Sequence, residues 1–83
     1  MAYDKFRFEI VKSLGVIAER TDNNGNKWTK EINLVSWNGR DPKIDIREWN
    51  GDHSRMSKGL TFTDEEAEPL CMILHNYLAE RNE

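Results

Sequence analysis

Apolar and polar residues alternate along the first three quarters of the chain. The alternation is clearest at 43–49, where Ile44 and Ile46 are separated by polar or charged residues, as in a strand with one buried face. Asn-Gly dipeptides interrupt it at 24–25, 38–39 and 50–51. Because Asn-Gly favours the positive φ angles of tight hairpin turns, the pattern predicts antiparallel strands at 6–20, 27–37, 43–49 and 55–62.

The first of these segments is too long for one flat strand. Phe6, Phe8 and Ile10 share one face, but the alternation then changes phase. Ser13 and Gly15 follow at this point and indicate a bulge or bend. We therefore expect the sheet to be curved.

From Thr63 onward the apolar period becomes helical. Thr63 followed three residues later by Glu66 forms a capping-box pattern, and apolar residues recur at helical spacing as far as Leu78. Pro69 lies beyond the expected first turn, so we expect a short opening turn or a kink, with the main helix over about 69–81. The predicted fold is α+β: one domain over 1–83, with a four-stranded antiparallel sheet (6–62) and one C-terminal helix (63–82).

Five consecutive residues of this helix, Leu70 to Leu74, are apolar. They point around the whole helix, so one sheet cannot cover them all. A chain this short with a single cysteine also has no intrachain disulfide to support its small core. We therefore expect a homodimer, with an interface that contains Leu70, Ile73, Leu74 and Tyr77.

The residues that commonly carry catalysis are few. Cys71, His53 and His75 are too few for a structural four-ligand zinc site. Cys71 lies on the apolar stripe and is interpreted as core, and His53 as a solvated turn residue. No phosphate-binding glycine loop or nucleophile motif is found. We expect no catalytic residue, no metal and no cofactor.

The net charge of −3 is unevenly distributed. Residues 1–62 contain eleven Lys/Arg and nine Asp/Glu, a balance of +2, whereas residues 63–83 contain one and six, a balance of −5. The acidic charge therefore belongs to the helix, and a mildly basic sheet is compatible with nucleic acid. The sequence has no apolar run of about 20 residues and no signal-peptide pattern at its start, so we expect a cytoplasmic, nucleoid-associated protein without a membrane contact.

Aromatic and basic residues are interleaved along the predicted strands. They are Lys12, Lys27, Trp28, Lys30, Trp37, Arg40, Lys43, Arg47, Trp49 and Lys58. Single-stranded nucleic acid is bound by this combination, in which rings stack on bases and cations neutralise phosphates. Lys43, Arg47 and Trp49 are expected to share one exposed face. The alternative is that the tryptophans pack in the core, as Trp28 would do beside Ile32 and Leu34.

Two motifs resemble the positive cofactor four family of transcriptional coactivators. One is Asp-Ile-Arg-Glu-Trp at 45–49, and the other is Lys-Gly-Leu-Thr-Phe-Thr at 58–63. Phe-Glu-Ile-Val-Lys at 8–12 is similar to the opening strand of that family. The extended pattern over 28–47 is closest to the bacterial stand-alone branch, the YdbC-type proteins.

The resemblance implies a curved four-stranded sheet and a helix that dimerises, with single-stranded DNA, or RNA in the bacterial branch, across the concave surface. By position, Lys12, Arg47 and Lys58 match the residues that meet the phosphate backbone. Trp49 is followed by Asn50 where the coactivator has a second aromatic residue, and Trp37 is the candidate for the stacking ring of the second hairpin. We expect no counterpart of the Ser- and Lys-rich regulatory arm of eukaryotic members, and therefore no coactivation through that arm.

Two functions follow from these observations. The first is sequence-tolerant binding of single-stranded DNA, or of RNA, by a dimer that acts in transcription, replication or repair. The second is a protein-interaction domain that uses the same sheet face or an edge strand.

Overall fold

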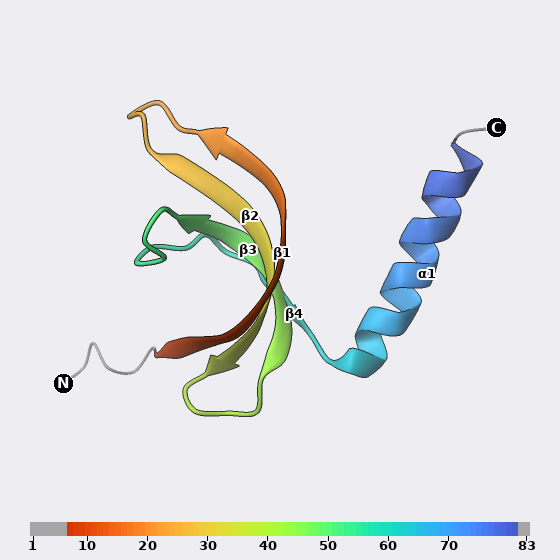
Figure 1. The fold of residues 1–83 in the computed structure, drawn as a ribbon. Helices are drawn as coiled ribbons and strands as arrows, with labels where there is room; N and C mark the ends of the chain where they lie inside the picture. Colours follow the sequence, from red (N-terminus) through yellow and green to blue (C-terminus); the bar gives the residue numbers. More distant parts are fainter. Residues whose placement is uncertain (1–6, 82–83) are drawn as a thin grey trace.

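The computed structural model describes residues 7–81 and confirms the predicted fold class. Four antiparallel strands form one open sheet in the order β1-β2-β3-β4, and a single helix follows (Figure 1). The elements are β1 (Phe8–Thr21), β2 (Lys27–Trp37), β3 (Lys43–Asn50), β4 (Leu60–Phe62) and α1 (Asp64–Glu80).

The sheet is strongly curved, and β1 carries the irregularities that accompany the curvature. Its register against β2 shifts between Ile10 and Lys12, between Ser13 and Gly15, and between Val16 and Ala18. Each shift adds a residue to one strand and increases the local twist. The prediction of a bulge at Ser13 and Gly15 is therefore confirmed.

Curvature brings distant parts of the sheet together on its concave side. Phe8 pairs with Trp37 at one end of β2, whereas Trp49 pairs with Thr29 near the other end. The ring centroids of Phe8 and Trp49 are nevertheless 5.1 Å apart. In Figure 1 the loop between β3 and β4 lies on this side and α1 on the convex side.

The two faces of the sheet differ in composition. The concave face contains the fully buried residues Val35, Trp49, Asn33 and Asp45. The convex face has a half-buried apolar cluster at its centre, made by Ile32, Leu34, Ile44, Ile46 and Phe62. The compact core of the single chain therefore lies inside the curl, and its polar residues are buried there.

The first two predicted turns are confirmed. Gly25, Asn38 and Gly39 adopt positive φ angles of 84°, 54° and 76°, which Gly and Asn tolerate best. The third differs, because a loop of nine residues separates β3 from β4.

The predicted strand over 55–62 is therefore too long. Met56 makes only an isolated bridge to Trp49. In this segment side-chain oxygens accept hydrogen bonds that backbone carbonyls accept in a regular strand pair. Glu48 N donates to Ser57 Oγ (3.0 Å), and Arg55 N donates to Asn50 Oδ1 (2.9 Å).

Helix α1 begins with the predicted capping box. Thr63 N donates to Glu66 Oε1 (2.9 Å), and Glu66 N donates to Thr63 Oγ1 (3.1 Å). The helix is continuous from Asp64 to Glu80 with Pro69 inside it, so the expectation of a separate opening turn before Pro69 is wrong. Within residues 7–81, no helix has the length and apolar composition needed to cross a membrane.

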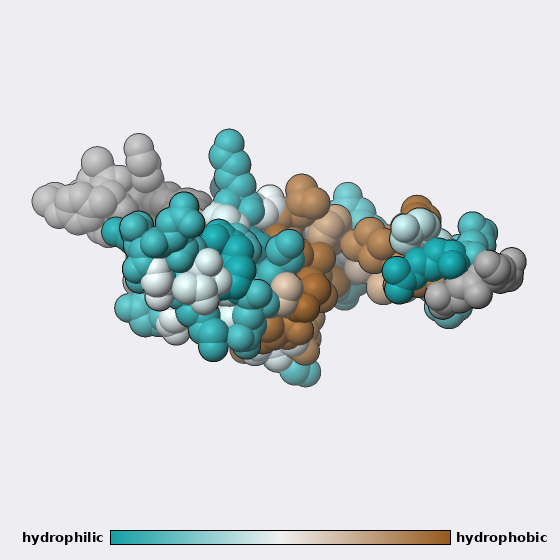
Figure 2. Space-filling view, turned by 90° about the horizontal axis from the view of Figure 1, so that it is seen from above, coloured by the Kyte–Doolittle hydropathy of each residue, from teal (hydrophilic) through white to brown (hydrophobic). Residues whose placement is uncertain are grey.

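The apolar side of α1 has no cover within the described chain. The helix contacts only β3 and β4 and then extends away from the sheet (Figure 1). Ile73 is 64% exposed and Tyr77 is 61% exposed. The interpretation of Cys71 as core is also wrong, since it is exposed. Figure 2 shows apolar surface on both the sheet and the helix, where they face each other across the molecule.

Gly59 provides a test of the packing between the β3–β4 loop and β3. A Cβ atom at Gly59 would lie 2.5 Å from the Ile46 carbonyl oxygen and 2.5 Å from Arg47 Cβ. We expect Gly59→Ala to lower the free energy of unfolding by roughly 1–3 kcal/mol, measured by urea denaturation. Gly51→Ala is the matched control because its Cβ would meet nothing within 4 Å. Equal stability of the two variants would contradict this packing.

Candidate nucleic-acid interface

A cavity of about 290 Å³ lies where the β2–β3 turn meets the concave face. It is lined by Trp37, Arg40, Asp41, Lys43, Arg47 and Thr61. Trp37 is the last residue of β2 and Lys43 is the first of β3, so the short turn places a ring and two exposed cations, Arg40 and Lys43, at one site. The structure thus brings together four of the predicted residues: Trp37, Arg40, Lys43 and Arg47.

Arg47 is held by protein partners on the concave face. Its guanidinium donates to both carboxylate oxygens of Asp45, at 2.8 and 2.7 Å, and its side chain is only 12% exposed. It also lies over the Trp37 ring at 4.5 Å and donates to the Ser57 carbonyl at 3.3 Å. In this structure Arg47 therefore positions the Trp37 ring and the β3–β4 loop.

Trp49 projects from the same face as Arg47, but the expectation that it is exposed is wrong. Its side chain is fully buried, with Phe8 at 5.1 Å and His53 at 5.4 Å between ring centroids. The curl of the sheet and the β3–β4 loop cover it. In this conformation Trp49 has no ring surface to offer to a base.

Trp28 and Lys30 lie on the opposite, convex face, since they pair with Asn50 and Glu48. Trp28 shares this face with Ile32 and Leu34, as the alternative interpretation proposed. Its indole Nε1 donates to Asp22 Oδ2 at 3.0 Å.

The remaining predicted lysines are exposed but scattered. Lys12 pairs with Leu34 in the register of β1 with β2. Lys27 forms an ion pair with Glu19 at 3.3 Å, and Lys58 lies in the β3–β4 loop. The ten predicted residues therefore occupy both faces of the sheet. Among the described residues, four of them meet at the Trp37 cavity, whereas Lys27 and Trp28 line a separate cavity together with Arg55 and Asp52.

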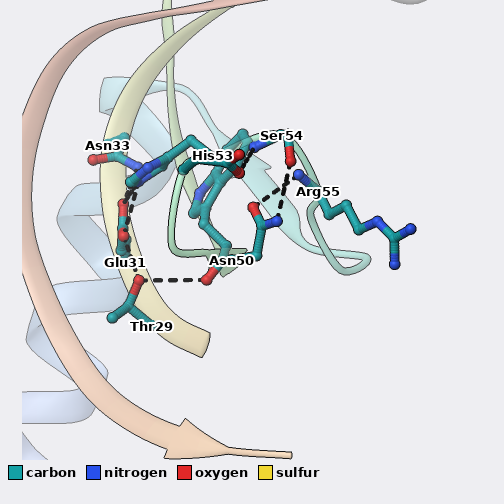
Figure 3. A network of polar contacts seen from close by, with 9 residues as sticks. Thr29, Glu31, Asn33, Asn50, His53, Ser54 and Arg55 are labelled. Carbon is teal, nitrogen blue, oxygen red and sulfur yellow. Dashed lines mark hydrogen bonds and ion pairs between the residues drawn. The ribbon is translucent and has the colours of Figure 1, made fainter. Parts of the chain in front are cut away.

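Sequence reasoning missed a polar network that ties the β3–β4 loop to β2 (Figure 3). His53 Nε2 lies 3.0 Å from both Glu31 oxygens, Asn33 Nδ2 donates to Glu31 Oε1 at 3.1 Å, and the Thr29 hydroxyl donates to Glu31 Oε2. His53 also has a positive φ of 60°. His53 is half-buried, so our interpretation of it as a solvated turn residue is wrong. No sequence signal indicates its contact with Glu31, because the two residues are 22 positions apart.

The Glu31 carboxylate is buried yet remains ionised. Burial acts to raise its pKa, but hydrogen bonds from Thr29, Asn33 and His53 outweigh this effect and bring the pKa below its ordinary value. The network therefore holds a negative charge beneath the β3–β4 loop.

Two comparisons with known proteins agree with this architecture. The family model for transcriptional coactivator p15 (PC4) matches residues 25–73, more than half of the chain. This chain belongs to the PC4 family. It is also 38% identical over 73 residues to an uncharacterized protein of Treponema pallidum (strain Nichols), covering 88% of this chain and 81% of that protein. The PC4 family consists of non-enzymatic, DNA-binding proteins, so a nucleic-acid-binding role is supported at the level of the family.

The Glu31 network predicts a loss of stability in acid. Because the pKa of Glu31 is lower in the folded chain, its contribution to stability is fully present above its unfolded pKa, about 4.3. This contribution is lost as the pH falls through the folded value. We expect Glu31→Gln to flatten the fall in unfolding free energy below about pH 4.5, measured by urea denaturation across pH. Glu9→Gln, at an exposed strand position, is the control; equal acid sensitivity of wild type and Glu31→Gln would contradict this role.

Proposed function

We propose that this PC4-family protein binds single-stranded DNA, with RNA as an alternative ligand, as a sequence-tolerant homodimer. The observation that carries the proposal is the cavity where the Trp37 ring lies beside Arg40 and Lys43. An unpaired base can stack on an aromatic ring whatever its identity, and adjacent cations neutralise the phosphates that flank it.

The charges around Trp37 favour an anion. Arg40, Lys43 and Arg47 line the cavity with one carboxylate, Asp41. The Arg47 charge is matched by Asp45, so the two exposed cations are the groups available to phosphate. The ring supplies stacking energy and the cations supply the salt-dependent part of the affinity.

Dimerisation is supported by the two apolar surfaces that the single chain leaves open. The exposed face of α1 includes Ile73, Leu74 and Tyr77, and the convex face of the sheet is only half-buried. Contiguous apolar surface of this kind typically marks an interface. A second copy would cover both, and the acidic helix would then lie away from the nucleic-acid face.

A protein-interaction domain is the second candidate, favoured by the exposed aliphatic residues of the edge strand β1. Val11, Leu14, Val16 and Ile17 are 47–57% exposed there. A partner strand added at this edge would bind largely through main-chain hydrogen bonds. Its affinity need not fall with salt as the affinity for a phosphate backbone does.

For the first candidate, we place the nucleic-acid complex in the cytoplasm, associated with the nucleoid, during transcription, replication or repair.

Single strands should be preferred over duplex by at least about tenfold, since the described chain presents a concave sheet and no helix placed to enter a major groove. Fluorescent oligo-dT, RNA and a blunt duplex of equal length, titrated at several salt concentrations, measure this preference. Equal affinity for oligo-dT and duplex at matched salt would contradict it, and an affinity independent of salt would favour the protein-interaction domain.

Trp37 and Lys43 should contribute to affinity in different ways. Trp37→Ala is expected to cost roughly 1–3 kcal/mol and to leave the salt slope nearly unchanged, because stacking releases few counterions. Lys43→Ala should weaken binding and reduce the salt slope by about 0.7, one phosphate contact on a single strand. Lys30→Ala on the convex face is the matched control. If it changes binding as much as Lys43→Ala, the concave cavity is not the site.

The helix should be required for dimerisation. Ile73→Glu places a charge in the proposed apolar interface, where burial without a partner is strongly unfavourable, so we expect a monomer in sedimentation at tens of micromolar. His75→Glu is the control because its side chain points toward the other side of the helix. A wild-type protein that sediments as a monomer would end the proposal of a dimer.

A further inference from the structure

A second cavity lies on the concave face, between β1 and the β3–β4 loop. Its volume is about 280 Å³, and it is lined by Ile10, Ser13, Val16, Glu31, Asn33 and His53. In the strand register these three β1 residues pair with Val35, Asn33 and Glu31, so they lie on the same face as Trp37. The cavity therefore belongs to the surface on which we propose that a single strand binds.

Two residues of β2, Glu31 and Asn33, supply oxygen acceptors to this cavity. The Asn33 side chain is fully buried, and its Nδ2 donates to Glu31. Its Oδ1 has no hydrogen-bond partner among the described residues. A buried carbonyl without a donor is costly, so a ligand with an N–H group at this position would gain a hydrogen bond that the free protein lacks.

His53 contacts the Glu31 carboxylate through one nitrogen, so a ligand with two donors could replace it. Its single Nε2 lies 3.0 Å from both carboxylate oxygens. A group with two parallel N–H bonds would add one hydrogen bond to each oxygen, beside those that Oε1 accepts from Asn33 and Oε2 accepts from Thr29, and such a bidentate pair is the stronger arrangement. Of the described lining residues, His53 alone lies outside the sheet, with a side chain 39% exposed on a left-handed backbone.

We propose that this cavity binds one guanine base of the bound strand. Guanine presents N1–H and the N2 amino group side by side, so these donate to the two Glu31 oxygens, and the second amino hydrogen donates to Asn33 Oδ1. Ile10 and Val16 contact the ring, and His53 swings aside. Adenine, cytosine and thymine lack two adjacent donors on the Watson–Crick edge, the edge by which unpaired bases are read.

This inference rests on the proposed function and adds to it a preference at one nucleotide. An arginine side chain of a peptide also carries two parallel N–H bonds. The neighbouring cavity, with Arg40 and Lys43 exposed, disfavours a cationic peptide on this face. A nucleobase is the occupant consistent with both cavities.

The test uses a short fluorescent oligo-dT in which one central thymine is replaced by guanine, by hypoxanthine or by adenine. Hypoxanthine keeps N1–H and lacks the N2 amino group. Anisotropy titrations of the full chain at one salt concentration should give about tenfold tighter binding for guanine than for thymine. Hypoxanthine should be intermediate, adenine should resemble thymine, and the salt slope should be the same for all four.

Three variants assign the preference to these residues. Glu31→Gln replaces one acceptor by a donor and should abolish the guanine preference while oligo-dT still binds. Glu48→Gln is the matched control, because it makes the same change on the convex face. His53→Gly removes the competing donor and suits the positive φ, so it should increase the guanine preference. Thermal melting establishes that each variant is folded.

Each outcome decides the proposal. Equal affinity of the wild type for guanine and thymine would overturn it and leave the proposed function in place. A guanine preference that persists in folded Glu31→Gln would also overturn it, and if that variant does not fold, an unchanged or weaker preference in His53→Gly would do so. An arginine peptide that displaces the guanine oligonucleotide but not oligo-dT would also overturn it, because a guanidinium would then be the preferred occupant of the cavity. Failure of all four oligonucleotides to bind would remove the proposed function and this inference with it.

Discussion

The curl of the sheet is the constraint on which the rest of the structure depends. Three register shifts in β1 accompany it, and its result is that Phe8 contacts both Trp37 and Trp49. A flat sheet would hold these two rings near opposite ends of an 11-residue strand. Because the curl brings them together, residues 7–81 form a buried core in which no helix covers the concave face, in a chain whose single cysteine can form no intrachain disulfide.

The core that results has an unusual composition, because polar groups are buried and aliphatic groups are left half-exposed. Asn33 and Asp45 are fully buried inside the curl, and each has a specific partner: Glu31 for Asn33, and Arg47 for Asp45. Buried polar groups of this kind are tolerated when they are hydrogen-bonded. The aliphatic residues of the convex face and of α1 differ from these polar groups. They stabilise the fold only when another surface covers them and removes them from water.

Arg47 and His53 link this core to the surface that we propose for nucleic acid. Arg47 joins Asp45, Trp37 and the Ser57 carbonyl, so one side chain fixes the ring of the candidate stacking site and one end of the β3–β4 loop. His53 fixes the other end through Glu31 and packs against Trp49. The shape of both concave cavities therefore depends on Arg47 and His53, each of which is held by a buried carboxylate.

The sequence by itself determined the local elements, because their signals are local. The alternation at 43–49, the positive-φ turns at Gly25 and Gly39, and the capping box at Thr63 each depend on a few neighbouring residues, and β2 begins and ends where the pattern predicts. Membership of the PC4 family was likewise visible in short motifs. Only the tertiary structure decided that Trp49 is buried while Trp37 lines a cavity, that Cys71 is exposed, and that Glu31 meets His53. These facts depend on how far the sheet curls and where the β3–β4 loop folds, and both are set by contacts between residues distant in the chain, which no periodicity records.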